Sequence, residues 1–393
     1  MISVKQAKEL IKNQLPGRQT DVVEISSCNG SVLAGDVTSA IDVPSFDNSA
    51  MDGYAFLFKP DCNKLNVIGE LKAGHLSQGS FIQPKEACRI FTGAAIPKGA
   101  DTVIPQELVE KGDEGTIEFD IHSIKPGANV RKKGTQTREG DVILRRGRVL
   151  DPGALALAAS VGVNELEIFH PPSIGIIVTG DELVPPGKKL KPGQIYDSNT
   201  TLLTAALDNL GIKPRLVFRA SDNRVELGEQ IDHCLENCDL VILTGGISVG
   251  DYDFVYELLN SRGVNKLFYK VKQRPGKPLF AGVRGDTMVF ALPGNPASVA
   301  SCFIQYVKPV IRHLLGFERP FEADAKLPLS TDFQKKKGLT FFLKVRATPS
   351  GAMVPDGQQS FNLMPFITSD AFAELDEEAT VVKAGTVVNV YRW

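Results

Sequence analysis

Apolar and polar residues alternate with two different periods along the chain, and the change of period separates its regions. Between residues 173 and 315, short apolar runs such as 174–179 and 240–243 are separated by longer stretches with the spacing of amphipathic helices. Further apolar runs lie at 215–220, 267–271, 278–283 and 288–292, and a long helix is expected from Pro296. Repeated βαβ units of this kind predict a mainly parallel sheet with helices on both faces.

The remaining residues follow a different pattern, in which short β-like runs are separated by Gly, Pro and Asn. Residues 56–133 show it without any helical period, which predicts a small all-β module. An amphipathic helix is expected after Ser3 and an apolar helix after Asp151, on either side of this module. We therefore predict four domains: a discontinuous N-terminal domain of residues 1–43 and 134–170, an inserted β domain of residues 44–133, an α/β domain of residues 171–318 and a C-terminal β-barrel of residues 319–393.

Composition narrows the class of protein. A chain of 393 residues with 42% hydrophobic content can bury a large core and form about two to four domains. The net charge of −2 provides no basic field for nucleic acid, and no apolar run is long enough for a membrane span or a signal peptide. A cytoplasmic protein is therefore expected. The six cysteines are scattered and favour reduced thiols, and a zinc site at His233, Cys234 and Cys238 is not favoured.

The stretch from Asp239 to Asp253, DLVILTGGISVGDYD, joins a buried strand to a helix through a glycine turn. Gly245 and Gly246 can adopt positive φ and let backbone N–H groups approach an anion closely. The turn by itself is equally typical of an ordinary strand-to-helix connection. The hydroxyl and carboxylate groups that follow it favour a binding site, and they belong to Ser248, Asp251 and Asp253, with Gly250 among them.

Charged residues follow several of the expected strands, so one cleft at the carboxyl ends of a parallel sheet could collect them. The carboxylates are Asp181, Glu182, Asp222, Asp251 and Asp253, and the cations are Lys270, Lys272, Arg274 and Lys277. This mixture is typical of sites that hold phosphates with Mg²⁺. The turn at 274–277 and the turn at 293–296 could each hold a small anion, although each also fits a plain structural connection.

Seven motifs in order resemble the MoeA/gephyrin E-domain family of molybdopterin molybdenumtransferases: PSFDNSAMDGYA, FTGA, TGDEL, IYDSN, TGGISVGDYD, PGKP and LPGNP. The resemblance covers nearly the whole chain. It implies an interrupted N-terminal domain, a β lid, a molybdopterin-binding α/β domain and a C-terminal β-barrel. It also implies a homodimer with the active site between the α/β domain of one subunit and the lid of the other, and a molybdopterin adenylyltransferase as upstream partner.

The reaction implied by the resemblance is the insertion of molybdate into adenylylated molybdopterin with Mg²⁺-dependent release of AMP. Asp52 and Thr92 would be the lid residues, and Lys270 would lie with the catalytic groups. Glu182, Asp222 and Asp253 would supply carboxylates, the last two as metal ligands. The substrates would be held by Gly245, Gly246, Ser248, Gly250, Arg274, Lys277, Asn295, Lys344 and Ser360.

Three positions depart from the family pattern. Gln136 stands where the family usually has an acid, Arg274 replaces a usual Lys, and Lys344 replaces a usual Arg. A neutral Gln136 offers no negative ligand, so a non-catalytic pterin-binding or scaffold protein is the alternative. Arg and Lys differ in hydrogen-bond geometry, so the two swaps could alter oxyanion affinity. Molybdate and tungstate are not distinguished by the sequence.

Overall fold

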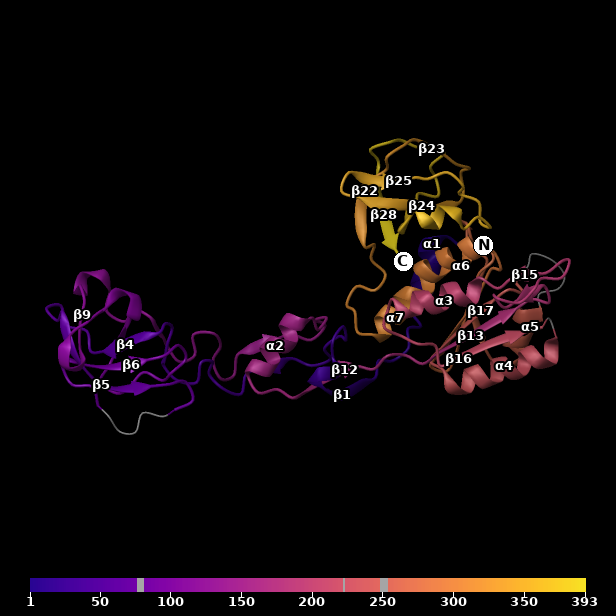
Figure 1. Cartoon of the computed structure of the whole chain (residues 1–393). Coiled ribbons are helices and arrows are strands. Elements are labelled where there is room, and N and C mark those ends of the chain that lie inside the picture. Colours follow the sequence, from indigo (N-terminus) through magenta and orange to yellow (C-terminus); the bar gives the residue numbers. More distant parts are fainter. Residues whose placement is uncertain (76–80, 222, 248–253) are drawn as a thin grey trace. The chain divides into compact units, whose positions relative to one another are not determined.

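The computed structural model describes residues 1–75, 81–221, 223–247 and 254–393, and the chain divides into two compact units (Figure 1). The first unit comprises Met1–Asp21, Gly30–Ala34 and Glu167–Trp393, and the second comprises Val22–Asn29 and Gly35–Leu166. β1 (Thr20–Glu24) and β12 (Glu165–Phe169) span the boundaries between the units. The boundaries of these two units cut through the predicted N-terminal domain of residues 1–43 and 134–170, and the four-domain division remains a prediction.

A six-stranded sheet forms the centre of the first unit, in the order β16-β13-β17-β21-β20-β18. Its parallel strands are β13 (Ile174–Thr179), β16 (Leu216–Ala220), β17 (Leu240–Thr244) and β21 (Thr287–Leu292). β20 (Phe280–Arg284) and β18 (Asn265–Tyr269) are antiparallel. Only Gly285 and Asp286 join β20 to β21, and two residues allow a hairpin but no crossover helix. The predicted mainly parallel sheet is confirmed, with this antiparallel edge as a difference.

Helices cover both faces of this sheet, and the buried residues accordingly fall into two core clusters. One cluster joins Ile176 of β13 to α3 (Asn199–Asp208) and to the long helix that begins at Pro296. The other joins Ile177, the next residue of β13, to α4 (Arg224–Asn237) and α5 (Phe254–Ser261). Successive residues of a strand point to opposite faces, which explains the division. None of the helices that the structure describes could cross a lipid bilayer.

The long helix predicted from Pro296 is present but is not uniform. It consists of α6 (Pro296–Cys302), a π-helical turn over Phe303–Val307 and α7 (Lys308–Leu314). Pro309 has no backbone N–H to donate to the preceding turn, and the helix widens just before it.

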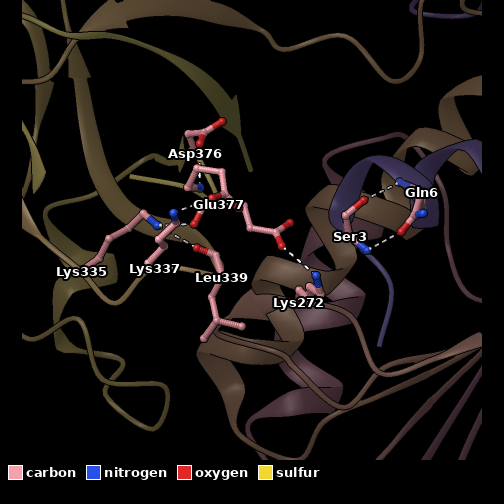
Figure 2. Close-up of polar contacts among 9 residues, drawn as sticks. Ser3, Gln6, Lys272, Lys335, Lys337, Leu339, Asp376 and Glu377 are labelled. Atoms are coloured by element: carbon pink, nitrogen blue, oxygen red, sulfur yellow. Dashed lines mark hydrogen bonds and ion pairs between the residues drawn. The ribbon is translucent and has the colours of Figure 1, made fainter. Parts of the chain in front are cut away.

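Helix α1 (Val4–Lys12) packs against the first core cluster, although residues 1–43 were predicted to join residues 134–170. Ser3 caps it in a capping box with Gln6, as expected from the sequence (Figure 2). Its buried residues Val4, Ala7 and Ile11 follow the helical period and belong to the core that includes Ile174. The sequence shows that this helix has an apolar face but not what the face packs against. In the structure, the face is buried on the α/β layer.

The C-terminal strands form a second sheet of the first unit with a core of its own. Its order is β19-β24-β26-β28-β22, and the bounds are β19 (Gln273–Arg274), β22 (Ala325–Pro328), β24 (Thr340–Thr348), β26 (Ala371–Leu375) and β28 (Val387–Arg392). Shorter elements are β14 (Leu183–Val184), β15 (Ile195–Tyr196), β23 (Phe333–Gln334), β25 (Gly351–Met353), β27 (Val381–Val382) and the 3₁₀ turn Met364–Ile367. Lys272, beside β19, forms an ion pair of 3.1 Å with Glu377, beside β26 (Figure 2). The predicted closed barrel remains a prediction.

The second unit is built on a six-stranded β-sheet, in agreement with the all-β pattern of residues 56–133. Its order is β7-β4-β6-β5-β9-β8, with bounds β4 (Gly53–Phe56), β5 (Lys64–Leu71), β6 (Glu86–Ile90), β7 (Thr102–Pro105), β8 (Glu110–Lys111) and β9 (Thr116–Glu118). Two further strand pairs are β3 (Asn48–Ser49) with β10 (Val130–Arg131) and β2 (Val37–Thr38) with β11 (Val142–Leu144). α2 (Pro152–Ser160) is capped by Asp151, as predicted; the 3₁₀ turns are Ile25–Ser27, Gln106–Leu108, Asp113–Gly115 and Ile121–Ser123.

Candidate functional site

The glycine turn after β17 has the backbone geometry predicted from its sequence. Gly245 has φ of 89° and Gly246 has φ of 64°. A Cβ atom at Gly245 would lie 2.1 Å from the carbonyl oxygen of Thr179, so the turn packs directly on the end of β13. The predicted residues Asp222, Ser248, Gly250, Asp251 and Asp253 lie outside the described residues.

Asn199, which was not predicted as a site residue, ties the start of α3 to the ends of two strands. Its Nδ2 donates to Thr244 Oγ1 at 3.0 Å and to the carbonyl oxygen of Gly294 at 2.8 Å. The Thr244 hydroxyl donates in turn to the carbonyl oxygen of Pro293 at 3.1 Å. Together these bonds hold the carboxyl ends of β17 and β21 and the first residue of α3 in one place.

Asp197 is a second site-forming residue that sequence reasoning missed. Ser198 occupies the N-cap position of α3, but its side chain makes no capping bond. Instead the buried carboxylate of Asp197 accepts from Thr200 N at 3.0 Å and from Arg219 Nε at 2.9 Å. Burial alone would raise the pKa of Asp197, but the hydrogen bonds from Thr200 and Arg219 outweigh it and hold that pKa low. The sequence signal that could have identified Asp197 is an acidic residue just before the start of a helix.

Glu182 lies at the carboxyl end of β13, as the sequence predicted. Gly180 precedes it with φ of 153°, and a Cβ there would be 2.8 Å from Glu182 Oε2. Glu182 and its neighbour Asp181 are both exposed. The Glu182 carboxylate therefore lies against bare backbone at the strand end.

The basic turn of Arg274 to Lys277 is tight and is supported by buried side chains. Gly276 has φ of 84°, and a Cβ there would be 2.4 Å from Cys302 Sγ on α6. The buried amide of Gln273 donates from Nε2 to the Gly276 carbonyl oxygen at 2.8 Å. Arg274 and Lys277 are both exposed, and their role in holding an anion stays a prediction.

The aromatic neighbours of these cations limit their freedom. The Arg274 guanidinium lies 5.6 Å from the ring centroid of Phe341, within range of a cation–π contact. Lys270 has φ of 73°, and its ammonium lies 5.2 Å from the ring centroid of Tyr269.

Asn295 and Ser360, far apart in the chain, are brought together at the start of α6. Asn295 Nδ2 donates to Ser360 Oγ at 3.2 Å, and Ala297 N donates to the Ser360 carbonyl oxygen at 3.1 Å. The two predicted cofactor-binding residues therefore share one location.

Lys344, which the resemblance assigns to the oxyanion site, has its ammonium enclosed by backbone carbonyl oxygens. Its side chain is 2% exposed, and Nζ donates to the carbonyl oxygens of Gly357, Gln359 and Asn362 at 2.9, 3.1 and 3.0 Å. An ammonium has three donors, so all are used within the protein. Burial lowers the pKa of Lys344. This geometry makes Lys344 the support of the loop that carries Ser360.

In the second unit, Asp52 and Thr92 form the pair that the motifs predicted. Asp52 Oδ1 accepts from both the backbone N and the hydroxyl of Thr92, each at 2.8 Å. These two bonds lower the pKa of Asp52 and keep it ionised. The next residue, Gly53, fits closely, because a Cβ there would lie 2.0 Å from the Ile104 carbonyl oxygen.

The described residues contain no group of three or more His, Cys, Asp or Glu side chains that could hold a metal ion. The predicted metal ligands, Asp222 and Asp253, are not among the described residues, so the predicted Mg²⁺ site is not tested. All six cysteines are buried and free, in agreement with the predicted reduced thiols.

Three family models match successive parts of the chain. Residues 2–162 match the MoeA N-terminal region (domain I and II), residues 175–313 a probable molybdopterin binding domain, and residues 326–393 the MoeA C-terminal region (domain IV). The chain is 36% identical to a molybdopterin molybdenumtransferase of Haemophilus influenzae, over 99% of this chain and 98% of that protein. A protein of the same name from Nostoc sp. is 38% identical over 82% of this chain and 76% of its own length.

Solved structures show the same relationship. The molybdopterin biosynthesis MoeA protein of Pyrococcus horikoshii has a TM-score of 0.84 and 30% identity, and the match covers 100% of this chain and 99% of that chain. A likeness of this extent covers both the α/β and the β parts of the fold.

Proposed function

The chain belongs to the MoeA family, and we propose that it is a molybdopterin molybdenumtransferase, which inserts molybdate into adenylylated molybdopterin and releases AMP. The full-length likeness to relatives that bear this name is the observation that carries the proposal. The reaction would be the last step of molybdenum cofactor biosynthesis. The geometry of the site supports it with groups suited to anions and to phosphate.

Two turns of the first unit suit the anionic parts of the substrates. The turn of Gly245 and Gly246 leaves the backbone bare at a strand end, where a phosphate can bind N–H groups. Arg274 and Lys277 extend from one tight turn and would hold molybdate, which is a small dianion. Asn295 and Ser360 would line the same end of the α/β layer.

Asp52 is the group best placed to handle a proton or a cation in the second unit. Both hydrogen bonds from Thr92 end on Oδ1, so Oδ2 remains for a ligand within the part of the chain described. An ionised carboxylate with one oxygen fixed is pre-oriented for this purpose.

Mg²⁺ is the cation that the family implies, and hard oxygen ligands are what it prefers. The exposed carboxylate of Glu182 is of the right type and lies at a strand end; Asp222 and Asp253 would be the further ligands. When bound, Mg²⁺ would offset the negative charge of the substrate phosphates.

We propose further that the protein acts as a homodimer with the four-domain arrangement and C-terminal barrel of the family, and that it receives its substrate from a molybdopterin adenylyltransferase in the cytoplasm. Light scattering on the purified chain measures the oligomeric state. Mixed dimers of an Asp52→Ala chain and an Arg274→Ala chain then test subunit sharing. Recovery of activity on mixing supports a site built from two subunits, and no recovery contradicts it.

An assay of the purified protein with adenylylated molybdopterin, molybdate and Mg²⁺ tests the activity. We expect AMP to be released together with a cofactor that activates an apo-molybdoenzyme. Release must depend on molybdate. If the protein binds the substrate but forms neither product, the non-catalytic alternative replaces this proposal.

A further inference from the structure

The amide of Asn199 is held in one orientation at the ends of β17 and β21. Its Nδ2 faces the Gly294 carbonyl oxygen at 2.8 Å, and a carbonyl can only accept. The Thr244 hydroxyl donates its hydrogen to the Pro293 carbonyl oxygen. Its oxygen therefore acts as the acceptor for Asn199 Nδ2 at 3.0 Å. The neighbours therefore determine which end of the amide is nitrogen and which is oxygen.

This orientation leaves the other end of the amide without a partner. Asn199 is 7% exposed, and among the described residues its buried Oδ1 accepts no hydrogen bond. Buried polar atoms are nearly always paired, and an exception calls for an explanation such as a ligand. Within the described part of the chain, Oδ1 is the side-chain atom of this network that lacks a hydrogen-bond partner.

The position and the charge of Oδ1 restrict the ligand. Asn199 lies beyond the carboxyl ends of parallel strands, which is where such sheets bind ligands. A neutral carbonyl oxygen repels phosphate and molybdate but accepts a hydrogen bond from an N–H group. Among the substrate parts in the proposed function, the N–H groups belong to the nitrogen heterocycles, and the other donors are hydroxyl groups.

We propose that Asn199 is a specificity-determining residue that accepts a hydrogen bond from an N–H group of a substrate heterocycle. The inference rests on the proposed function, because that function supplies the heterocycles. Both the pterin ring and the adenine ring carry an exocyclic amino group, so the shared chemistry is an aromatic amine. Asn199 would select for that amine, while the turns nearby hold the anions.

Binding to ligand pairs that differ in this amine tests the proposal on the full chain. One pair is 6-hydroxymethylpterin and 6-hydroxymethyllumazine, where an oxygen replaces the amino group. The other is AMP and purine ribonucleoside monophosphate, which lacks the amino group. We expect the protein to prefer the amine of one pair by about tenfold, which corresponds to about 1.4 kcal/mol. The pair that shows this preference identifies the ring.

Two variants separate ligand contact from a structural role. Asn199→Ala removes the acceptor and should reduce the preference to about twofold or less. Asn199→Asp keeps an acceptor and loses the Nδ2 bonds, so it should retain the preference even if overall binding weakens. A purely structural Asn199 would weaken both ligands of a pair equally in both variants. Circular dichroism and thermal melting confirm that each variant is folded.

The outcomes distinguish this inference from the proposed function. If the wild-type protein shows no preference in either pair, or Asn199→Ala keeps it, the inference is overturned. If the preference behaves as expected but molybdate insertion is absent, the proposed function fails and the binding site stands.

Discussion

Gly245 shows how the backbone can require one residue type. Two features exclude a side chain at this position: its positive φ, and the 2.1 Å that would separate a Cβ from the Thr179 carbonyl oxygen. The first feature can be anticipated from a TGG turn, because it depends on neighbouring residues. The second depends on β13, which lies some 65 residues earlier and is parallel to β17.

We expect Gly245→Ala to lower the free energy of unfolding by about 2–4 kcal/mol and to abolish substrate binding, because strain and a backbone clash add. Gly263→Ala is the matched control, since Gly263 also has positive φ, at 76°, but nothing lies within 4 Å of its added Cβ. It should cost about 1 kcal/mol and leave binding intact. Urea denaturation and ligand titration measure both effects; equal costs for the two variants would rule out the clash.

Asp52→Asn should lower the thermal midpoint only slightly and lower turnover by about 100-fold or more, because Oδ1 still accepts from Thr92 while the negative charge is lost. Thr92→Val removes one of the two bonds that lower the pKa of Asp52. The pKa then rises, so activity that needs the carboxylate should fade at a higher pH than in the wild type. Rate measurements from pH 4 to pH 8 test this; an unchanged acid limb would exclude Asp52 as the titrating group.

The buried Lys308 should make the free energy of unfolding depend on pH in the alkaline range. Burial lowers the pKa of Lys308 to about 8, although Nζ donates to the Arg392 carbonyl oxygen at 2.6 Å. Between pH 8 and pH 10.5 the unfolded chain binds more protons than the folded chain at this residue, so stability rises with pH. Relative to Lys308→Met, the wild type should gain about 3 kcal/mol over this range. Urea denaturation of both proteins measures the difference; parallel curves would show that the pKa is ordinary.

At the scale of elements, local sequence patterns predicted the helices and strands well. Only the structure showed which elements pack against one another. α1 and α2 begin at the predicted caps, and the apolar runs of β13 and β17 are strands. The antiparallel β18 and β20, the π turn within the long helix and the role of Lys344 were not foreseen. Each depends on a chain path or on partners that sequence spacing does not specify.

The loop of residues 357–362 illustrates such a dependence. We expect Lys344→Met to lower the free energy of unfolding by about 2–4 kcal/mol, because the three carbonyl oxygens that the buried Lys344 ammonium holds lose their donor. The loop carries Ser360 to Asn295, so the KM for molybdate should rise as well. Lys326→Met, at an exposed position of β22, should change neither quantity. Denaturation and steady-state kinetics measure both; a higher KM without any loss of stability would instead indicate direct contact with the anion.

At the scale of the whole molecule, the two units have separate cores, which predicts separable unfolding. Phe56→Ala, in the second unit, should lower the stability of that unit by about 3–5 kcal/mol. Phe290→Ala should do the same for the first unit. Scanning calorimetry should show that each substitution moves its own transition and leaves the other in place. A single transition that moves with both would show that the units unfold together.

Sequence alone determined the succession of strands and helices, the glycine and basic turns, the Asp52 and Thr92 motifs and the family, because these depend on residue types over short spans. Tertiary structure decided that α1 packs on the α/β core, that Lys344 supports a loop, and that Asp197 and Asn199 organise the strand ends. These features depend on partners that are far apart in the chain, such as Lys8 and Tyr391, which are 383 residues apart, and no local pattern encodes which buried group meets which. The folded chain sets those partners, because nearly all buried donors and acceptors in a native structure are paired.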